Sequence, residues 1–182
     1  MNPADDAAWT SLQELQTLAC WAEGRARAVE VGTWKGRSAE AIAFGQGDEG
    51  RLWCVDDWSG DPDERTRRLY FPQSLTPGGV TEVREAWRER MKDYLHRVTL
   101  VERTSEVACC SFADGSLDMV FLDGCHIFEV MLCGLAAWQP KVKPGGLLCG
   151  HDADQSGVVR ALLERFPGMI EYGPGKLWRT RQ

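Results

Sequence analysis

The fold is decided by the stretch Val29-Glu30-Val31-Gly32-Thr33-Trp34-Lys35-Gly36-Arg37-Ser38. Its apolar start has the pattern of a buried strand, which runs into an acidic residue and a glycine turn before a helix begins. A second strand, Leu52–Val55, ends in Asp56, 24 residues after Gly32. This layout is typical of a nucleoside site, because the turn backbone approaches the ligand and the second acid accepts hydrogen bonds from ribose hydroxyls.

The composition is that of a soluble globular protein with one domain. The 182 residues are 43% hydrophobic and 26% charged, which provides one full core, so we expect a single domain over residues 1–182. The net charge of −6 disfavours nucleic acid as a partner. No apolar run reaches the ~20 residues of a membrane helix, and the acidic N-terminus lacks the order of a signal peptide. We therefore expect a cytoplasmic protein without nucleic-acid or membrane partners.

Strand and helix signals alternate along the chain, which predicts an α/β fold with a mostly parallel sheet and helices on both faces. Besides the two strands above, strands are expected at 98–101, 117–122 and 147–150, and a closing hairpin at 169–172 and 177–180. Helical periodicity covers 5–23 (within an N-terminal segment 1–24), 36–44, 81–96, 128–138 and 157–166. The segment 58–95 opens with an irregular, proline-containing stretch, and we interpret the segment as a lid or insertion.

Polar residues follow the expected strands at the points where they end. These groups are Glu30-Val31-Gly32, Asp56-Asp57, Glu102 to Glu106, Asp123-Gly124-Cys125-His126 and Gly150-His151-Asp152. Carboxylates avoid protein cores unless they are paired, so burial does not explain this pattern. In an open parallel sheet, ligands bind beyond the carboxyl ends of the strands. The sequence therefore predicts one convergent site at that edge.

The glycine turn departs from the fingerprint of a dinucleotide site. That fingerprint has its second glycine two residues after the first, where the backbone approaches the pyrophosphate. Here the position is Trp34, whose side chain would crowd a diphosphate. A nicotinamide or flavin dinucleotide is therefore disfavoured.

Four motifs in order resemble the class I S-adenosylmethionine-dependent methyltransferases. They are Glu30 to Ser38, Val55-Asp56-Asp57-Trp58, Phe121 to His126 and Lys143-Pro144-Gly145-Gly146. The resemblance covers residues 27–181, and the most similar sub-group is the small metal-dependent O-methyltransferases, catechol-type and sugar- or natural-product-directed. It implies a Rossmann-like fold, with a seven-stranded sheet whose last strand is antiparallel. It also implies methyl transfer from S-adenosylmethionine to a hydroxyl of a small-molecule substrate.

The resemblance implies a role for each matching residue. Those expected around S-adenosylmethionine are Glu30, Gly32, Trp34, Ser38, Asp56, Asp57, Ser105, Glu106 and Asp123. Those expected to hold a divalent metal are Asp123, His151 and Asp152. His126 stands where catechol enzymes have a lysine general base, and with Asp123 it forms the expected catalytic pair. Oxygen ligands favour Mg²⁺; a histidine ligand, in place of the Asp-Asn pair of catechol enzymes, favours Mn²⁺ or Fe²⁺.

Structural roles are the alternatives for these residues. Asp123 would cap the following helix, and His126 and His151 would be hydrogen-bonded without contacting metal or substrate. The rival functions are a NAD-dependent oxidoreductase, a metal-dependent hydroxylase and a non-catalytic nucleotide-binding protein. The N-terminal helix carries Trp9 and Trp21, and it would either form a homodimer contact or cover the site.

Overall fold

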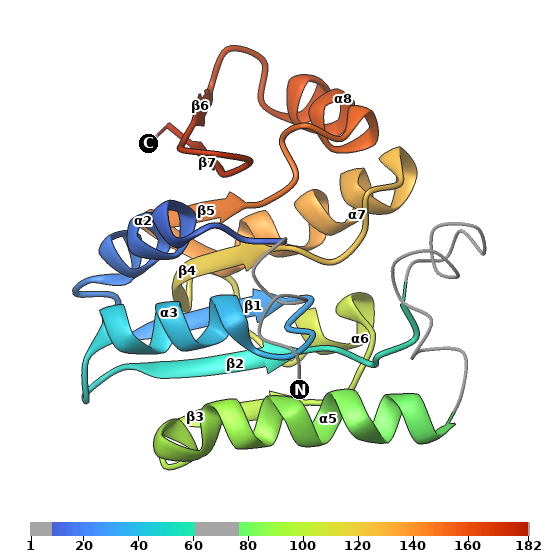
Figure 1. Ribbon diagram of the computed structural model, residues 1–182. Coiled ribbons are helices and arrows are strands. Elements are labelled where there is room, and N and C mark those ends of the chain that lie inside the picture. The colour runs from blue at the N-terminus through green and yellow to red at the C-terminus, as the bar shows by residue number, and fades with distance from the viewer. Residues whose placement is uncertain (1–8, 61–76, 182) are drawn as a thin grey trace.

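The computed structural model describes residues 9–60 and 77–181, and within them one sheet lies between two layers of helices (Figure 1). The strands are β1 (Arg27–Val31), β2 (Arg51–Val55), β3 (Val98–Val101), β4 (Leu117–Leu122), β5 (Val142–Gly150), β6 (Ile170–Tyr172) and β7 (Trp178–Thr180). The helices are α2 (Leu12–Ala22), α3 (Arg37–Gln46), α5 (Pro77–Met91), α6 (Ser105–Cys109), α7 (Phe128–Trp138) and α8 (Ser156–Arg165), with 3-10 turns η2 (Lys92–Tyr94) and η3 (Gln139–Lys141). The predicted α/β class is confirmed.

The sheet has the order β3-β2-β1-β4-β5-β7-β6. Strands β1 to β5 are parallel, whereas β7 pairs antiparallel with both β5 and β6. The chain starts at the centre with β1, builds outward to β3 and then returns to add β4 on the other side of β1. The strand order therefore reverses between β1 and β4, which is where open α/β sheets bind ligands. The predicted antiparallel closing hairpin is confirmed.

Two hydrophobic layers hold the helices against the sheet. Helices α2, α3 and α5 cover one face, where Ile42 and Trp87 are buried in one cluster with Phe121. Helices α6, α7 and α8 cover the other, where Leu135 and Leu162 are buried in the same cluster as the strand residues. Every residue of β4 is buried, as expected for a central parallel strand. Among the described residues, no helix combines the length and the apolar character needed to cross a membrane.

Close packing explains both glycines of the turn after β1. Gly32 has φ +86°, and a Cβ there would lie 2.3 Å from the carbonyl oxygen of Asp123. Gly36 has φ +81°, and its Cβ would lie 3.0 Å from Cδ1 of Trp87. The Trp87 indole N–H also donates to Thr33 Oγ1 at 3.0 Å. The turn therefore needs glycine in order to fit against the end of β4 and against α5.

The second half of segment 58–95, which was expected to be a lid or insertion, forms a helix that packs against the sheet. Residues 77–91 form α5, which starts before the expected helix start at Thr81, because proline suits a first helical turn. Trp87 and Met91 are buried against α3 and the sheet, since these residues belong to its hydrophobic cluster. Residues 61–76 lie outside the described residues, and so do residues 5–8 of the predicted N-terminal helix.

The expected turn at Lys143-Pro144-Gly145-Gly146 lies inside β5. The pairing of β4 with β5 shifts between Leu117↔Val142 and Met119↔Leu147, so the four residues 143–146 of β5 lie opposite the single residue Asp118 of β4. The turn residues therefore form an irregularity that bends β5 before its buried half. Helix α6 is a short element that was not expected, and it follows β3 directly.

We predict that Gly32→Ala lowers the free energy of unfolding by more than ~3 kcal/mol, because a left-handed φ and a backbone clash act together. The matched control is Gly24→Ala: Gly24 has φ +70° and no atom within 4 Å of the added Cβ. This control should lose only about 1 kcal/mol. Urea unfolding of both variants tests the prediction, and equal losses would contradict it.

Candidate active site

One cavity of about 920 Å³ opens at the carboxyl ends of the parallel strands. Its wall includes the residues that follow β1, β2, β3, β4 and β5, so the five predicted groups of polar residues meet there. The predicted site residues in its wall are Gly32, Trp34, Ser38, Asp56, Asp57, Ser105, Glu106, Asp123, His126, His151 and Asp152. The cavity lies at the reversal of strand order between β1 and β4.

Asp56 joins the turn after β1 to the loop after β2. Its Oδ2 accepts from the backbone N–H of Trp34 and its Oδ1 from that of Trp58, both at 2.8 Å. The Trp58 indole N–H also donates to the Trp34 carbonyl at 3.4 Å. Both tryptophans have positive φ, 44° and 52°, a strained conformation that these contacts stabilise. Burial raises the pKa of Asp56, and a carboxylate has about four acceptor sites, so Asp56 can also accept from a ligand hydroxyl.

Two further parts of the wall lie beside Asp56. Asp57 is exposed, and its Oδ1 accepts from the Ser59 backbone N–H at 3.0 Å and from its hydroxyl at 2.7 Å. Ser105 begins α6, and its hydroxyl accepts from the indole N–H of Trp138 at 2.9 Å. Glu106 follows it in the wall with an exposed side chain.

Glu30 is not part of the wall, which corrects its expected place around the cofactor. Along a strand, side chains alternate between the two faces, and Glu30 points into the face covered by α3, beside Cys54 and Ser38. It is completely buried, and no described residue donates a hydrogen bond of normal geometry to either carboxylate oxygen. Burial raises the pKa of Glu30 to about 7, against the lowering effect of the Ser38 and Thr33 side chains.

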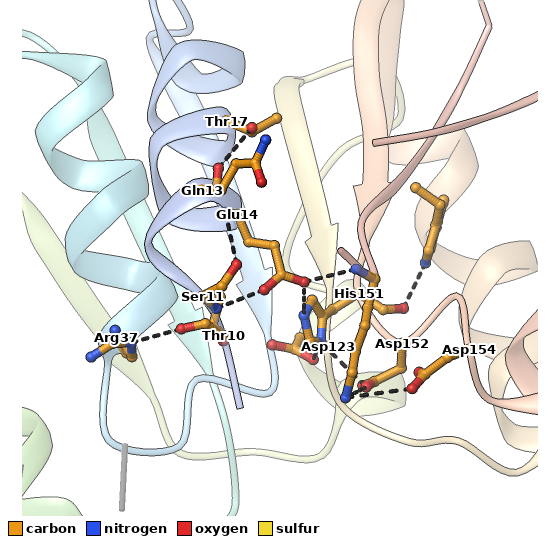
Figure 2. Close-up of polar contacts among 12 residues, drawn as sticks. Thr10, Ser11, Gln13, Glu14, Thr17, Arg37, Asp123, His151, Asp152 and Asp154 are labelled. Carbon is orange, nitrogen blue, oxygen red and sulfur yellow. Dashed lines mark hydrogen bonds and ion pairs between the residues drawn. The ribbon is translucent and has the colours of Figure 1, made fainter. Parts of the chain in front are cut away.

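Three potential metal ligands come together where β4 and β5 end. Asp123, His151 and Asp152 each offer one ligand atom, and these atoms lie within 4.8 Å of one another. His151 Nδ1 is 3.5 Å from Asp123 Oδ1 and 3.3 Å from Asp152 Oδ1 (Figure 2). Asp152 adopts φ 58°, a third strained residue in the wall. Two carboxylates and one imidazole form a donor set that suits a divalent cation.

The charges of this cluster depend on one another. Burial raises the pKa of Asp123 well above its usual range, although the neighbouring His151 acts against this. Burial also disfavours the charged forms of Asp152 and His151, but the contacts between these two side chains favour the charged forms more strongly. Hydrogen bonds from His126 and His151 hold the pKa of Asp152 well below its ordinary value. The carboxylates of Asp152 and Asp123 raise the pKa of His151 to about 9.

Asp152 also contacts the predicted base. His126 Nε2 lies 2.7 Å from Asp152 Oδ2, while Asp152 Oδ1 faces His151. The two oxygens of one carboxylate therefore serve two different groups. An imidazole oriented by a carboxylate in this way can receive a proton and be stabilised as the cation.

Residues of the N-terminal segment take part in the site although no sequence motif indicates it. Trp9 and Thr10 line the cavity, and the Arg37 side chain donates to the Thr10 carbonyl at 3.2 Å (Figure 2). Glu14 Oε1 lies 3.1 Å from His151 Nε2. The pattern Ser11-x-x-Glu14 is the signature of a helix start, but no local signal reveals a partner 137 residues away. Of the two roles considered for this segment, covering the site is what its position supports.

The comparisons with known proteins give one family. The sequence profile of the family described as "Methyltransferase domain" matches residues 29–153. No curated protein matches this sequence. The resemblance to methyltransferases stated from the motifs is confirmed.

Solved structures with the same fold come from bacteria and a fungus. The O-methyltransferase from Bacillus cereus in complex with SAH (S-adenosylhomocysteine) has a TM-score of 0.62 and 15% identity, over 98% of this chain and 87% of that one. The O-methyltransferase TomG from Streptomyces achromogenes is involved in tomaymycin synthesis and was solved with S-adenosylmethionine. It has a TM-score of 0.63 and 14% identity, over 95% of this chain and 82% of that one. The SAH-bound methyltransferase PaMTH1 from Podospora anserina has a TM-score of 0.65 and 15% identity, over 97% of this chain and 81% of that one. At these identities the likeness shows a shared fold.

We predict that Glu30 makes stability fall as the pH rises. Its carboxyl has a pKa of about 7 in the fold and 4.5 as the ordinary value, so unfolding releases a proton between these pH values. The folded state therefore loses up to ~3 kcal/mol between pH 4.5 and 7, because the buried group must finally ionise. Glu30→Gln removes this loss.

Urea unfolding at pH 5 and pH 8 measures the effect as the difference between Glu30→Gln and the unmodified protein. The exposed Glu49 supplies the control Glu49→Gln, which removes the same charge from the surface. The free energy of unfolding of Glu30→Gln minus that of the unmodified protein should be larger at pH 8 than at pH 5. For Glu49→Gln this difference should be the same at both pH values. An identical pH dependence of stability for all three proteins would show that the fold does not raise the pKa of Glu30.

Proposed function

The chain belongs to the family of methyltransferase domains, and from this membership we propose that it transfers a methyl group from S-adenosylmethionine to a hydroxyl of a small molecule, assisted by a divalent metal. The observation that carries the proposal is that one cavity joins two sets of residues. One set, around Asp56, suits a nucleoside. The other, around Asp123 and His126, suits an acceptor hydroxyl and its proton.

The cofactor-binding residues are those of the wall around the turn after β1. Asp56 and Asp57 hold the ribose, Ser105 and Glu106 lie beside adenine, and the methionine part lies along Gly32, Trp34 and Ser38. S-adenosylmethionine supplies an electrophilic methyl on its sulfonium. The chain's contribution is alignment, because displacement at that carbon depends on the position of the attacking oxygen. Strained backbone at Trp34 and Trp58, held by Asp56, supports a pre-organised site.

The residues that would hold the metal are Asp123, His151 and Asp152. Their donor set fits a divalent ion, because each residue offers one ligand atom and these atoms lie within 4.8 Å of one another. Such an ion would lower the pKa of a bound hydroxyl and fix its position. Mg²⁺ suits the two carboxylates, and the imidazole favours Mn²⁺ or Fe²⁺.

His126 is the proposed base. It receives the hydroxyl proton as the new C–O bond forms and the bond from carbon to sulfur breaks, which leaves a neutral thioether. Asp152 Oδ2, 2.7 Å from His126 Nε2, stabilises the imidazolium. In this proposal Asp123 and Asp152 hold the metal close to the reacting oxygen, and His126 accepts the proton from that oxygen.

We predict that Asp56→Asn weakens binding of S-adenosylhomocysteine at least tenfold. The substitution replaces a carboxylate oxygen with an amide N–H that faces the donor N–H of Trp34 or Trp58, and it also weakens the bond to the ribose. The comparison variant is Asp48→Asn, which makes the same substitution at an exposed side chain outside the cavity wall. We expect less than about a threefold loss there. Isothermal titration measures both, and an unchanged affinity of Asp56→Asn would refute the cofactor placement.

We also predict that chelation stops methyl transfer but spares cofactor binding, because the metal ligands and the ribose-binding residues occupy different parts of the cavity. The assay measures formation of S-adenosylhomocysteine with a panel of phenolic and sugar acceptors, before and after EDTA treatment and after addition of Mg²⁺ or Mn²⁺. Transfer that persists after complete chelation would remove the metal from the mechanism. Loss of cofactor binding on chelation would contradict the division of the cavity.

A further inference from the structure

Glu14 is a buried carboxylate on α2 that contacts His151, a residue of the cavity wall. Its side chain is 5% exposed, and it contacts three groups (Figure 2). Oε1 accepts from the backbone N–H of Lys176 at 2.8 Å and lies 3.1 Å from His151 Nε2. Oε2 accepts from the backbone N–H of Ser11 at 2.6 Å. An ordinary helix-capping glutamate makes only the last of these contacts and lies in solvent.

Residues of β7 and of the turn before it leave space for the Glu14 carboxylate and fix the backbone of its partner His151. Gly175, in the turn between β6 and β7, has φ +60°, and a Cβ there would lie 2.3 Å from Glu14 Oε1. The Trp178 indole N–H donates to the His151 carbonyl at 2.8 Å and fixes its backbone. Two elements remote in sequence from α2 therefore leave room for this carboxylate and hold its histidine partner in place.

Glu14 determines which ring nitrogen of His151 faces the two aspartates. Both oxygens of Glu14 accept backbone N–H bonds, Oε1 from Lys176 and Oε2 from Ser11, which is the arrangement of a carboxylate that only accepts. His151 Nε2 must then carry hydrogen and donate to it. The other ring nitrogen, Nδ1, points at Asp123 and Asp152, at 3.5 and 3.3 Å.

We infer that Glu14 is a positioning residue for the metal site: it holds His151 so that Nδ1 is presented as the third ligand beside Asp123 and Asp152. The inference rests on the proposed function, whose metal ligands it uses. A carboxylate that accepts from the outer N–H of a ligating histidine fixes the ring orientation and raises ligand basicity. Here that carboxylate comes from the N-terminal helix, so docking of α2 completes the site.

The main experiment measures Mn²⁺ affinity of the full chain by isothermal titration and by electron paramagnetic resonance. We expect Glu14→Ala to bind Mn²⁺ 10- to 100-fold more weakly, the usual effect of losing such a partner. Glu14→Gln should lose less, because its amide oxygen can still accept from Nε2–H. The matched control is Ser11→Ala, which removes the capping acceptor of the Glu14 N–H at 3.3 Å. It should lower the melting temperature by a few degrees and leave Mn²⁺ affinity within twofold.

A second readout needs no metal. The chain has three histidines, so the ring N–H signals of His151 can be assigned by nitrogen-15 NMR with His96→Gln and His126→Gln. The Nε2–H signal of His151 should be protected from exchange in the unmodified protein and in Ser11→Ala, and lost in Glu14→Ala. If Glu14→Ala does not fold, Glu14→Gln carries both comparisons, with a weakened signal and an intermediate Mn²⁺ affinity.

The outcomes separate this inference from the proposed function. Normal Mn²⁺ affinity and a protected signal in Glu14→Ala would overturn the positioning role and leave the proposed metal site standing. Equal losses of affinity in Glu14→Ala and Ser11→Ala would also overturn it, because both would then reflect undocking of α2. An unmodified protein that binds no Mn²⁺ would refute the metal site and this inference with it, whereas cofactor binding would still be tested separately.

Discussion

The close approach of Gly32 to the backbone of Asp123 is the constraint on which the site depends. A Cβ at position 32 would lie 2.3 Å from the Asp123 carbonyl oxygen, so the ends of β1 and β4 meet without a side chain between them. Backbone hydrogen bonds continue the contact on both sides: Gly32 N–H donates to the Val55 carbonyl at 2.9 Å and Asp123 N–H to the Val31 carbonyl at 2.8 Å. Asp56 and Asp123 are thereby brought to one cavity.

The N-terminal helix extends this arrangement from the sheet to the wall of the cavity. Arg37 at the start of α3 holds the Thr10 carbonyl, and Glu14 reaches His151 at the end of β5. Helices α2 and α3 pack together on one face of the sheet (Figure 1). Strand ends, the glycine turn and the first helix thus form one connected framework, in which strained backbone at Trp34, Trp58 and Asp152 is concentrated around the cavity.

Features set by local pattern were predictable from the sequence. Strand β4 and helix α7 match their predicted bounds because an apolar run or a helical stripe is bounded by turn residues. The meeting of polar residues at one edge also followed from parallel strands. Contacts between remote segments were not predictable. Examples are Glu14 with His151 and the burial of Glu30 under α3, since facing depends on packing that no local spacing encodes.

The most direct test of the account is a crystal structure of the protein grown with S-adenosylhomocysteine and Mn²⁺. We expect a ribose bonded to Asp56 and an anomalous manganese signal between Asp123, His151 and Asp152. A nucleoside bound elsewhere, away from the ends of β1 and β2, would contradict it.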